Sequence, residues 1–240
     1  SYFKAFGELV ICYDSKNYWR REYFPEYKAG RRKSRETSSH DWNDIFECLN
    51  AIKSEIRENF PYKVLEVYGA EADDIIAALC GELEFDNGKT LILSGDKDFI
   101  QLHRFKNVKQ YSPITKKFIN GEDPTEYLYQ HILKGDSSDG IPNVLSPDNT
   151  FVDGLRQRPL SKKKISEWAG PLCEQVLPND ELKRNYQRNK KLIDLQETPK
   201  ELHLECIRTY QDAPEGDRSK LLNYFIKNRL NDLMENIGDF

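Results

Sequence analysis

The chain has 240 residues, of which 38% are apolar and 32% charged, and its formal net charge is −4. This size allows one large domain or two small ones, with a folded core beneath a heavily charged surface. No apolar stretch approaches the roughly 20 residues that a membrane helix needs, and we expect no membrane association. Five scattered cysteines without a C-x-x-C pair favour reduced thiols over a disulfide framework, and four dispersed histidines are expected at the surface or in the core.

The amino-terminal half alternates predicted strands with predicted helices. Apolar runs predict strands over 8–13, 63–67 and 90–94, and helical spacing of apolar residues predicts packed helices over 41–60 and 71–84. This alternation favours a parallel sheet with right-handed crossovers. Short strands are expected at 108–111 and 117–119, followed by a helix over 123–134.

Two segments carry concentrated positive charge. Residues 16–35 contain eight basic and two acidic residues, interleaved with aromatic side chains, and residues 156–164 contain five basic residues and no acid. Such segments can hold phosphates and stack on bases, which suits a polyanionic partner. Either run alone could equally be an ordinary solvated face.

Acidic residues follow the predicted strands or lie in turns at four places. The carboxyl ends of parallel strands meet at one edge of a sheet, where ligands bind. So many like charges repel unless cations neutralise them, and Mg²⁺ prefers carboxylate oxygens, water and phosphate. The sequence therefore predicts a metal site for phosphodiester chemistry, although any single Asp could be a helix cap. These acids are Asp14, Glu71, Asp73, Asp74, Asp96, Asp98, Asp136 and Asp139.

Strand signals fade beyond residue 135, and helical patterns dominate to the end of the chain. We predict an α/β core over 1–134, with a basic arch segment at 15–40, and a helical duplex-binding region over 135–240.

These motifs, in this order, resemble the flap endonuclease and 5′-nuclease family, and within it the T-even bacteriophage type of ribonuclease H. The resemblance covers essentially the whole chain, and five motifs in order, together with the carboxyl-terminal tail, are more specific than any one alone. The segments that carry it are 10–14, 24–31, 71–74, 94–99, 135–142 and 224–240.

The resemblance implies a mostly parallel PIN-like sheet flanked by helices, with a helix–three-turn–helix-like motif after residue 135. It implies a nuclease that hydrolyses 5′ ends and flaps of duplex DNA or RNA–DNA hybrid, and that removes RNA primers in phage-type replication. Two Mg²⁺ ions, for which Mn²⁺ can substitute, would activate water, with Lys28 and Asp96 as catalytic residues. The implied ligands are Asp14, Glu71, Asp73 or Asp74, and Asp96 for one ion, and Asp98, Asp136 and Asp139 for the other.

The resemblance also implies nucleic-acid contacts from both basic segments. Single-strand-binding protein and a sliding clamp are further partners that the resemblance allows. It also implies a monomer in the cytoplasm of a bacterial host. The expected contact residues are Arg20, Arg21, Lys28, Arg31, Arg32, Arg35, Arg156, Arg158, Lys162, Lys163 and Lys164.

Two departures from the family pattern stand out. Relatives begin with a further strand that ends in another ligand Asp, and nothing before residues 1–4 supplies it, so a central strand is expected to be missing between those that lead to Asp14 and Asp96. The Gly-rich hairpin that binds K⁺ in many relatives is also absent from 143–159. The alternatives are a catalytically impaired nucleic-acid-binding fragment and a PIN-like endoribonuclease.

Overall fold

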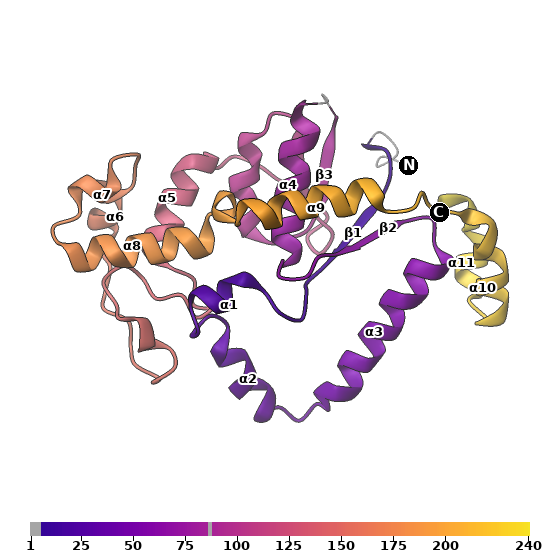
Figure 1. The fold of residues 1–240 in the computed structure, drawn as a ribbon, viewed down its shortest axis with the longest axis horizontal. Helices are drawn as coiled ribbons and strands as arrows, with labels where there is room; N and C mark the ends of the chain where they lie inside the picture. The colour runs from indigo at the N-terminus through magenta and orange to yellow at the C-terminus, as the bar shows by residue number, and fades with distance from the viewer. Residues whose placement is uncertain (1–5, 86–87) are drawn as a thin grey trace.

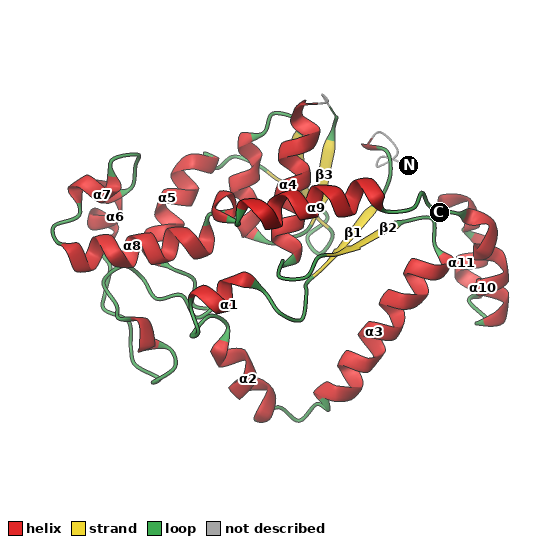
Figure 2. Ribbon diagram, viewed as in Figure 1, coloured by secondary structure: helices red, strands yellow, loops and turns green. Residues whose placement is uncertain are grey.

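A computed structural model describes residues 6–85 and 88–240, with the side chains at 32, 33, 84 and 85 outside the description. Short strands and covering helices form an α/β body, and two helices project from it (Figure 1). Helices outnumber strands throughout, and most of the carboxy-terminal half is helical (Figure 2). Among the described residues, no helix is both long and apolar enough to cross a lipid bilayer.

The strands lie within two residues of their predicted positions. β1 (Val10–Tyr13) pairs in parallel with β2 (Lys63–Glu66). β3 (Thr90–Leu93) pairs in parallel with β4 (Val108–Ser112), which pairs antiparallel with β5 (Lys117–Ile119). The α/β class with mostly parallel pairing is therefore confirmed.

Within the described chain, the sheet is in two pieces. β1 and β3 line the same apolar cavity of about 590 Å³, and neither pairs with another strand along that side. Leu9 and Leu93 at its border are 40% and 44% exposed. Unpaired strand edges beside apolar surface are suited to a further parallel strand. The space between β1 and β3 lies where the sequence predicts a further strand. That such a strand belongs there remains a prediction.

Helix α4 (Ala72–Phe85) occupies the centre of the body and packs on both pieces of the sheet. Ile75 and Leu79 pack beside β2 and against α9 (Lys200–Asp212), whereas Cys80 packs on the β3 side. After β3 the chain enters the 3₁₀ helix η2 (Lys97–Arg104).

The largest core cluster joins the two predicted domains. It includes Phe24 and Tyr27 from the first part of the chain and Tyr186 and Leu192 from the second. The predicted boundary falls at the end of α5. This helix packs on η2 from the first predicted domain and on α8 from the second, and the division into domains remains a prediction. The elements of this region are α5 (Pro124–Lys134), η3 (Asp148–Thr150), α6 (Lys162–Trp168), α7 (Cys173–Val176), α8 (Asp180–Ile193) and η4 (Leu195–Glu197).

The basic segment and the long helix after it form an arch. α1 (Trp19–Tyr23) lies on the body, and α2 (Ala29–Glu36) and α3 (Trp42–Asn59) extend from it and converge at residues 37–41 (Figure 1). The expectation that the apolar face of this helix packs is wrong, because α3 has no buried residue and Leu49 is 53% exposed. Apolar spacing identified the helix, but it contains no information on whether a partner covers it.

The carboxy-terminal helices hold the base of α3. Phe60, which follows α3, packs its ring against Phe225 and Phe240, with ring centroids 5.8 Å away in each case. Tyr224 donates a hydrogen bond to Glu55 at 2.7 Å. The elements here are η5 (Arg218–Lys220), α10 (Leu221–Lys227), α11 (Asn231–Glu235) and η6 (Ile237–Asp239).

We predict that a strand seated between β1 and β3 stabilises the body. An amino-terminal extension carrying an apolar strand that ends in Asp should raise the melting temperature by more than about 5 °C, since each buried aliphatic side chain contributes about 1.5–3 kcal/mol and 1 kcal/mol shifts Tm by about 2–4 °C. Calorimetry of the extended chain measures this. The control extension replaces the apolar strand residues by Ser and Lys, and equal melting temperatures for the two extensions would contradict the prediction.

Candidate metal centre

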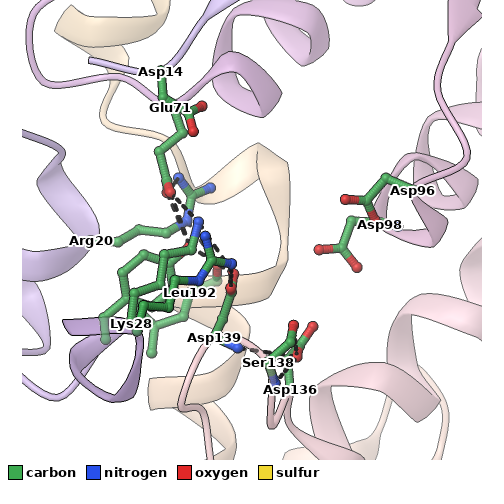
Figure 3. A network of polar contacts seen from close by, with 12 residues as sticks. Asp14, Arg20, Lys28, Glu71, Asp96, Asp98, Asp136, Ser138, Asp139 and Leu192 are labelled. Carbon is green, nitrogen blue, oxygen red and sulfur yellow. Dashed lines mark hydrogen bonds and ion pairs between the residues drawn. The ribbon is translucent and has the colours of Figure 1, made fainter. Parts of the chain in front are cut away.

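The structure brings the acids of all four sequence clusters around one space. Asp14 follows β1, Glu71 precedes α4, Asp96 caps η2, and Asp136 lies in the turn after α5. Figure 3 shows Asp96 and Asp98 facing Asp139 and Asp136 across the site, with Asp14 and Glu71 on a third side. A small cavity at the centre is lined by Asp73, Asp98, Asp136 and Asp139.

Two of these acids are buried against Arg20. The guanidinium donates from Nη1 to Glu71 Oε2 at 3.0 Å and to Asp74 Oδ2 at 2.8 Å, and from Nε to the carbonyl of Leu192 at 2.8 Å. Asp74 also accepts a hydrogen bond from Thr198 at 2.7 Å. The expected phosphate contact of Arg20 does not fit this placement, because its side chain is 3% exposed and its Nε and Nη1 are engaged within the core.

Lys28 and Arg31 neutralise Asp139, and Lys28 adds a second positive charge beside Glu71. Lys28 Nζ lies 2.5 Å from Glu71 Oε1 and 3.5 Å from Asp139 Oδ2, and the Tyr27 hydroxyl lies 3.0 Å from both carboxylates and can donate its one proton to either. Arg31 pairs with Asp139 at 2.5 Å. Burial lowers the pKa of Lys28, but the carboxylates of Asp139 and Glu71 outweigh it, so the pKa is raised and the ammonium stays charged at neutral pH.

Backbone contacts seat the beginning of the arch on the turn that carries Asp136 and Asp139. Lys28 has a φ of +56°, and its N–H donates to the carbonyl of Asp139 at 2.7 Å. Gly140 has a φ of +75°, and a Cβ there would meet the carbonyl oxygen of Glu26 at 3.0 Å. A side chain at this position would push the arch segment away from the acids.

A second group of acids lacks such neutralisation. In the described chain no Lys or Arg forms an ion pair with Asp73, Asp96 or Asp98. Burial, with the charges of Asp96 and Asp98, raises the pKa of Asp73 to about 8. The pKa of Asp98 is also raised, to about 6. Burial raises it, the nearby His131 lowers it, and the charge of Asp96 raises it further. Divalent cations favour the ionised form of such groups.

The geometry distinguishes Asp73 from Asp74, which the sequence leaves equivalent. Asp74 is 1% exposed and is bound by Arg20, Thr198 and the indole N–H of Trp19. Asp73 instead lines the central cavity. Asp73 is therefore the better candidate ligand, and Asp74 holds the surrounding elements together.

His131 is a member of the site that sequence reasoning missed. Its ring lies between Asp98 and Asp136, and its buried Nδ1 has no hydrogen-bond partner among the described residues. Hydrogen bonding from His131 and Ser138 lowers the pKa of Asp136 despite its partial burial. Carboxylate oxygens together with an orphaned buried nitrogen form a donor set that fits a divalent cation. The only sequence signal was a lone His five residues before Asp136.

Three polar residues of α8, also missed from the sequence, hold the loop after the Asp136–Asp139 turn. Asn189 and Arg188 both donate to the carbonyl of Pro142 at 2.9 Å, and Asn185 donates to that of Val144 at 3.0 Å. Buried polar side chains need such partners, so the loop and α8 specify each other's position.

Most of the remaining basic residues lie away from the acids of the metal centre, and Arg31, which pairs with Asp139, is the exception. Arg21 stacks over Tyr18, Arg35 over Phe46 at the tip of the arch, and Lys164 over Trp168. The Arg32 side chain lies outside the described residues. Those that are exposed to solvent and remain candidates for phosphate contact are Arg21, Arg31, Arg156, Arg158, Lys162, Lys163 and Lys164.

Two family models together cover almost the whole chain. The 5′-3′ exonuclease N-terminal resolvase-like domain matches residues 3–129, and the T4 RNase H C-terminal model matches residues 124–240. The ribonuclease H of Enterobacteria phage T4 is 34% identical over 98% of this chain and 80% of its own length. A 5′-3′ exonuclease of Buchnera aphidicola is 35% identical over 57% of this chain and 48% of its own length. The chain belongs to the 5′-3′ exonuclease family.

Solved structures agree with the fold. The bacteriophage T5 5′-exonuclease with bound zinc aligns over 89% of this chain and 88% of its own, with a TM-score of 0.66 at 19% identity. The T5 flap endonuclease in a complex with DNA and metal ions aligns over 88% of this chain and 86% of its own, also with a TM-score of 0.66, at 18% identity. At this identity the likeness establishes the fold alone.

We predict that Asp73 makes the metal-free protein less stable as pH rises. Its folded pKa of about 8 exceeds the ordinary value of 3.8, so its contribution to stability is lost as pH rises from about 4 to about 8. In EDTA at pH 8, Asp73→Asn should be more stable than wild type by at least about 1 kcal/mol, the equivalent of about one pKa unit, and the gain should vanish near pH 4. Urea denaturation across this pH range measures it.

Asp74→Asn is the matched control, because it removes a carboxylate that Arg20 stabilises and should lower stability at pH 8. The same pH dependence for wild type and Asp73→Asn would refute the assignment.

Proposed function

We propose that this chain is a divalent-metal-dependent 5′→3′ nuclease that hydrolyses phosphodiesters at the 5′ ends and flaps of duplex DNA and RNA–DNA hybrids. The observation that carries this proposal is the convergence of Asp73, Asp96, Asp98 and Asp136 on one space, directly beside the basic arch. Relatives named ribonuclease H, 5′-3′ exonuclease and flap endonuclease, and a T5 structure with DNA and metal ions, support it.

The candidate ligands divide into two sets. Asp14, Asp73 and Asp96, with Glu71 behind them, would hold one ion, and Asp98, Asp136 and Asp139 the other. We propose Mg²⁺ as the physiological ion at the first set, with Mn²⁺ able to replace it. When bound, such ions lower the pKa of a water molecule and stabilise charge on the leaving oxygen.

Lys28 would hold the scissile phosphate. Its ammonium lies between Glu71 and Asp139, at the junction of the arch and the acids, and its side chain is 10% exposed. The Tyr27 and Tyr18 rings lie 5.0 and 5.7 Å from it, which limits its alternative positions. A charged donor fixed beside the ions can orient a phosphate for in-line attack.

The arch and the exposed lysines would supply affinity. An acidic centre repels phosphate, so the positive charge needed for approach must come from around it. Arg31, at the start of the arch, is 47% exposed at its side chain and reaches Asp139. Lys162, Lys163 and Lys164 lie on α6, on the helical part of the molecule.

This function suits primer and flap removal in phage-type replication within a bacterial cytoplasm. A monomer on DNA, with single-strand-binding protein and a sliding clamp as recruiting partners, is part of the proposal. The match to the T4 RNase H carboxy-terminal model over 124–240 favours it over a PIN-like endoribonuclease.

A non-cutting nucleic-acid-binding protein is the second candidate. The gap between β1 and β3 favours it, because the acids at the ends of these strands lie on two sheet pieces that are not joined by a strand among the described residues. Mg²⁺-dependent cleavage of a 5′-flap substrate, abolished in Asp96→Asn, would reject it in favour of the nuclease.

We predict that Lys28 acts on the chemical step. Lys28→Ala should slow single-turnover cleavage of a 5′-flap duplex by about 10²-fold, the usual loss for one electrostatic donor, while binding measured in Ca²⁺ changes less than about threefold. Lys16→Ala, an exposed lysine of the same segment, is the control and should leave both unchanged. Equal losses of rate and affinity would assign Lys28 to binding alone.

We predict that α6 contributes phosphate contacts. Replacing Lys162, Lys163 and Lys164 by Ala should weaken duplex binding for every sequence and reduce the slope of log K against log salt by up to about 3, roughly one unit per contact. The control removes the same charge elsewhere, at Lys109, Lys116 and Lys117 around β4 and β5. Identical slopes for the α6 variant and wild type would contradict the prediction.

A further inference from the structure

The ring of His131 lies among the carboxylates of the metal centre, and the mechanism above leaves it without a role. It stands in the last turn of α5 with 13% of its side chain exposed. Nδ1 is 3.5 Å from Asp98 Oδ1, and Nε2 is 3.6 Å from Asp136 Oδ2. One ligand atom from each of the three residues lies within 4.8 Å of the others. Tyr127 packs edge-on against the ring, with centroids 5.6 Å apart, and restricts its orientation.

The 3.5 Å separation between Nδ1 and Asp98 Oδ1 matches two donors of one ion better than it matches a hydrogen bond. Donors bound at about 2.0–2.2 Å from one ion lie about 3.0 Å apart in octahedral geometry and about 3.4 Å apart in tetrahedral geometry. A charge-assisted hydrogen bond between nitrogen and carboxylate is about 2.7–2.9 Å long.

The burial of Nδ1 is a second, independent observation. This nitrogen is shielded from solvent and has no hydrogen-bond partner in the part of the chain that the structure describes. A buried nitrogen left without a partner costs free energy, which an ion bound at this position would offset. A hydrogen bond from Nε2 to Asp136 would leave Nδ1 as the unprotonated nitrogen, which is the form that binds a cation.

We propose that His131 Nδ1 is a ligand of the ion held by Asp98 and Asp136, and that this nitrogen makes the second site prefer Mn²⁺ and other first-row transition dications to Mg²⁺. Imidazole suits transition metals, whereas Mg²⁺ takes oxygen ligands and keeps its water. The inference rests on the proposed function only in placing the second ion at Asp98 and Asp136. The two sites would then differ in preference, since the first set holds oxygen donors only.

Pulsed electron paramagnetic resonance of the full chain loaded with Mn²⁺ tests this directly, because a nitrogen bound to Mn²⁺ modulates the echo. We expect nitrogen modulation in wild type, its change to the ¹⁵N pattern when histidine is ¹⁵N-labelled, and its loss in His131→Gln. The amide oxygen of Gln can still bind an ion, so the site should remain. His203→Gln, on α9, is the control and should keep the modulation.

Competition between Mn²⁺ and Mg²⁺ gives a second readout. Wild type should bind Mn²⁺ at one site at least tenfold more tightly than Mg²⁺. His131→Gln should reduce this ratio about tenfold, chiefly through weaker Mn²⁺ binding, as expected when a group that supports metal binding is removed.

Bound Mn²⁺ without nitrogen modulation in wild type, or modulation that persists in His131→Gln, would overturn the proposal. If His131→Gln does not fold, the ¹⁵N-histidine comparison in wild type decides alone. Neither measurement uses cleavage, so a failure of the nuclease proposal would be recognised separately by the flap assay.

Discussion

The buried guanidinium of Arg20 is the interaction on which the rest of the site depends. It joins Glu71, just before α4, and Asp74, in the first turn of α4, to the last turn of α8 through Leu192. Arg20 itself lies in α1, the helix that leads into the arch. A charge this deeply buried is tolerated only when it is paired and fully hydrogen-bonded, and removing one partner of such a pair costs about 3–5 kcal/mol. Three segments far apart in sequence are thereby held in one arrangement.

The same constraint divides the acids into two kinds. Glu71, Asp74 and Asp139 are neutralised by cations of the chain, so their charges position the arch and the turn after α5. Asp73 and Asp98 carry raised pKa values because burial and neighbouring carboxylates oppose their ionisation. The protein thus concentrates unfavourable charge where divalent cations can relieve it and removes it elsewhere.

The arch is supported at its two ends. α2 begins where Lys28 and Arg31 contact Asp139, and α3 ends where Phe60 packs on the carboxy-terminal helices. Between these points α3 buries no residue. Its position therefore depends on the contacts at its base and at its tip, because no hydrophobic core packs along its length. The arch is therefore coupled through α2 to the acids and through α3 to the end of the chain.

The sequence by itself determined the strands, most helices, the acidic clusters and the family, because periodicity and short motifs are local properties. It predicted which carboxylates converge, since the ends of parallel strands meet at one edge. Only the tertiary structure decided which of them line the central cavity: Asp73 and Asp74 are adjacent in sequence, yet Asp74 binds Arg20 and Asp73 lines the cavity. It also buried Arg20, exposed α3 and placed His131 among the acids. Burial and charge pairing depend on neighbours distant in the chain, and a local pattern carries no information about them.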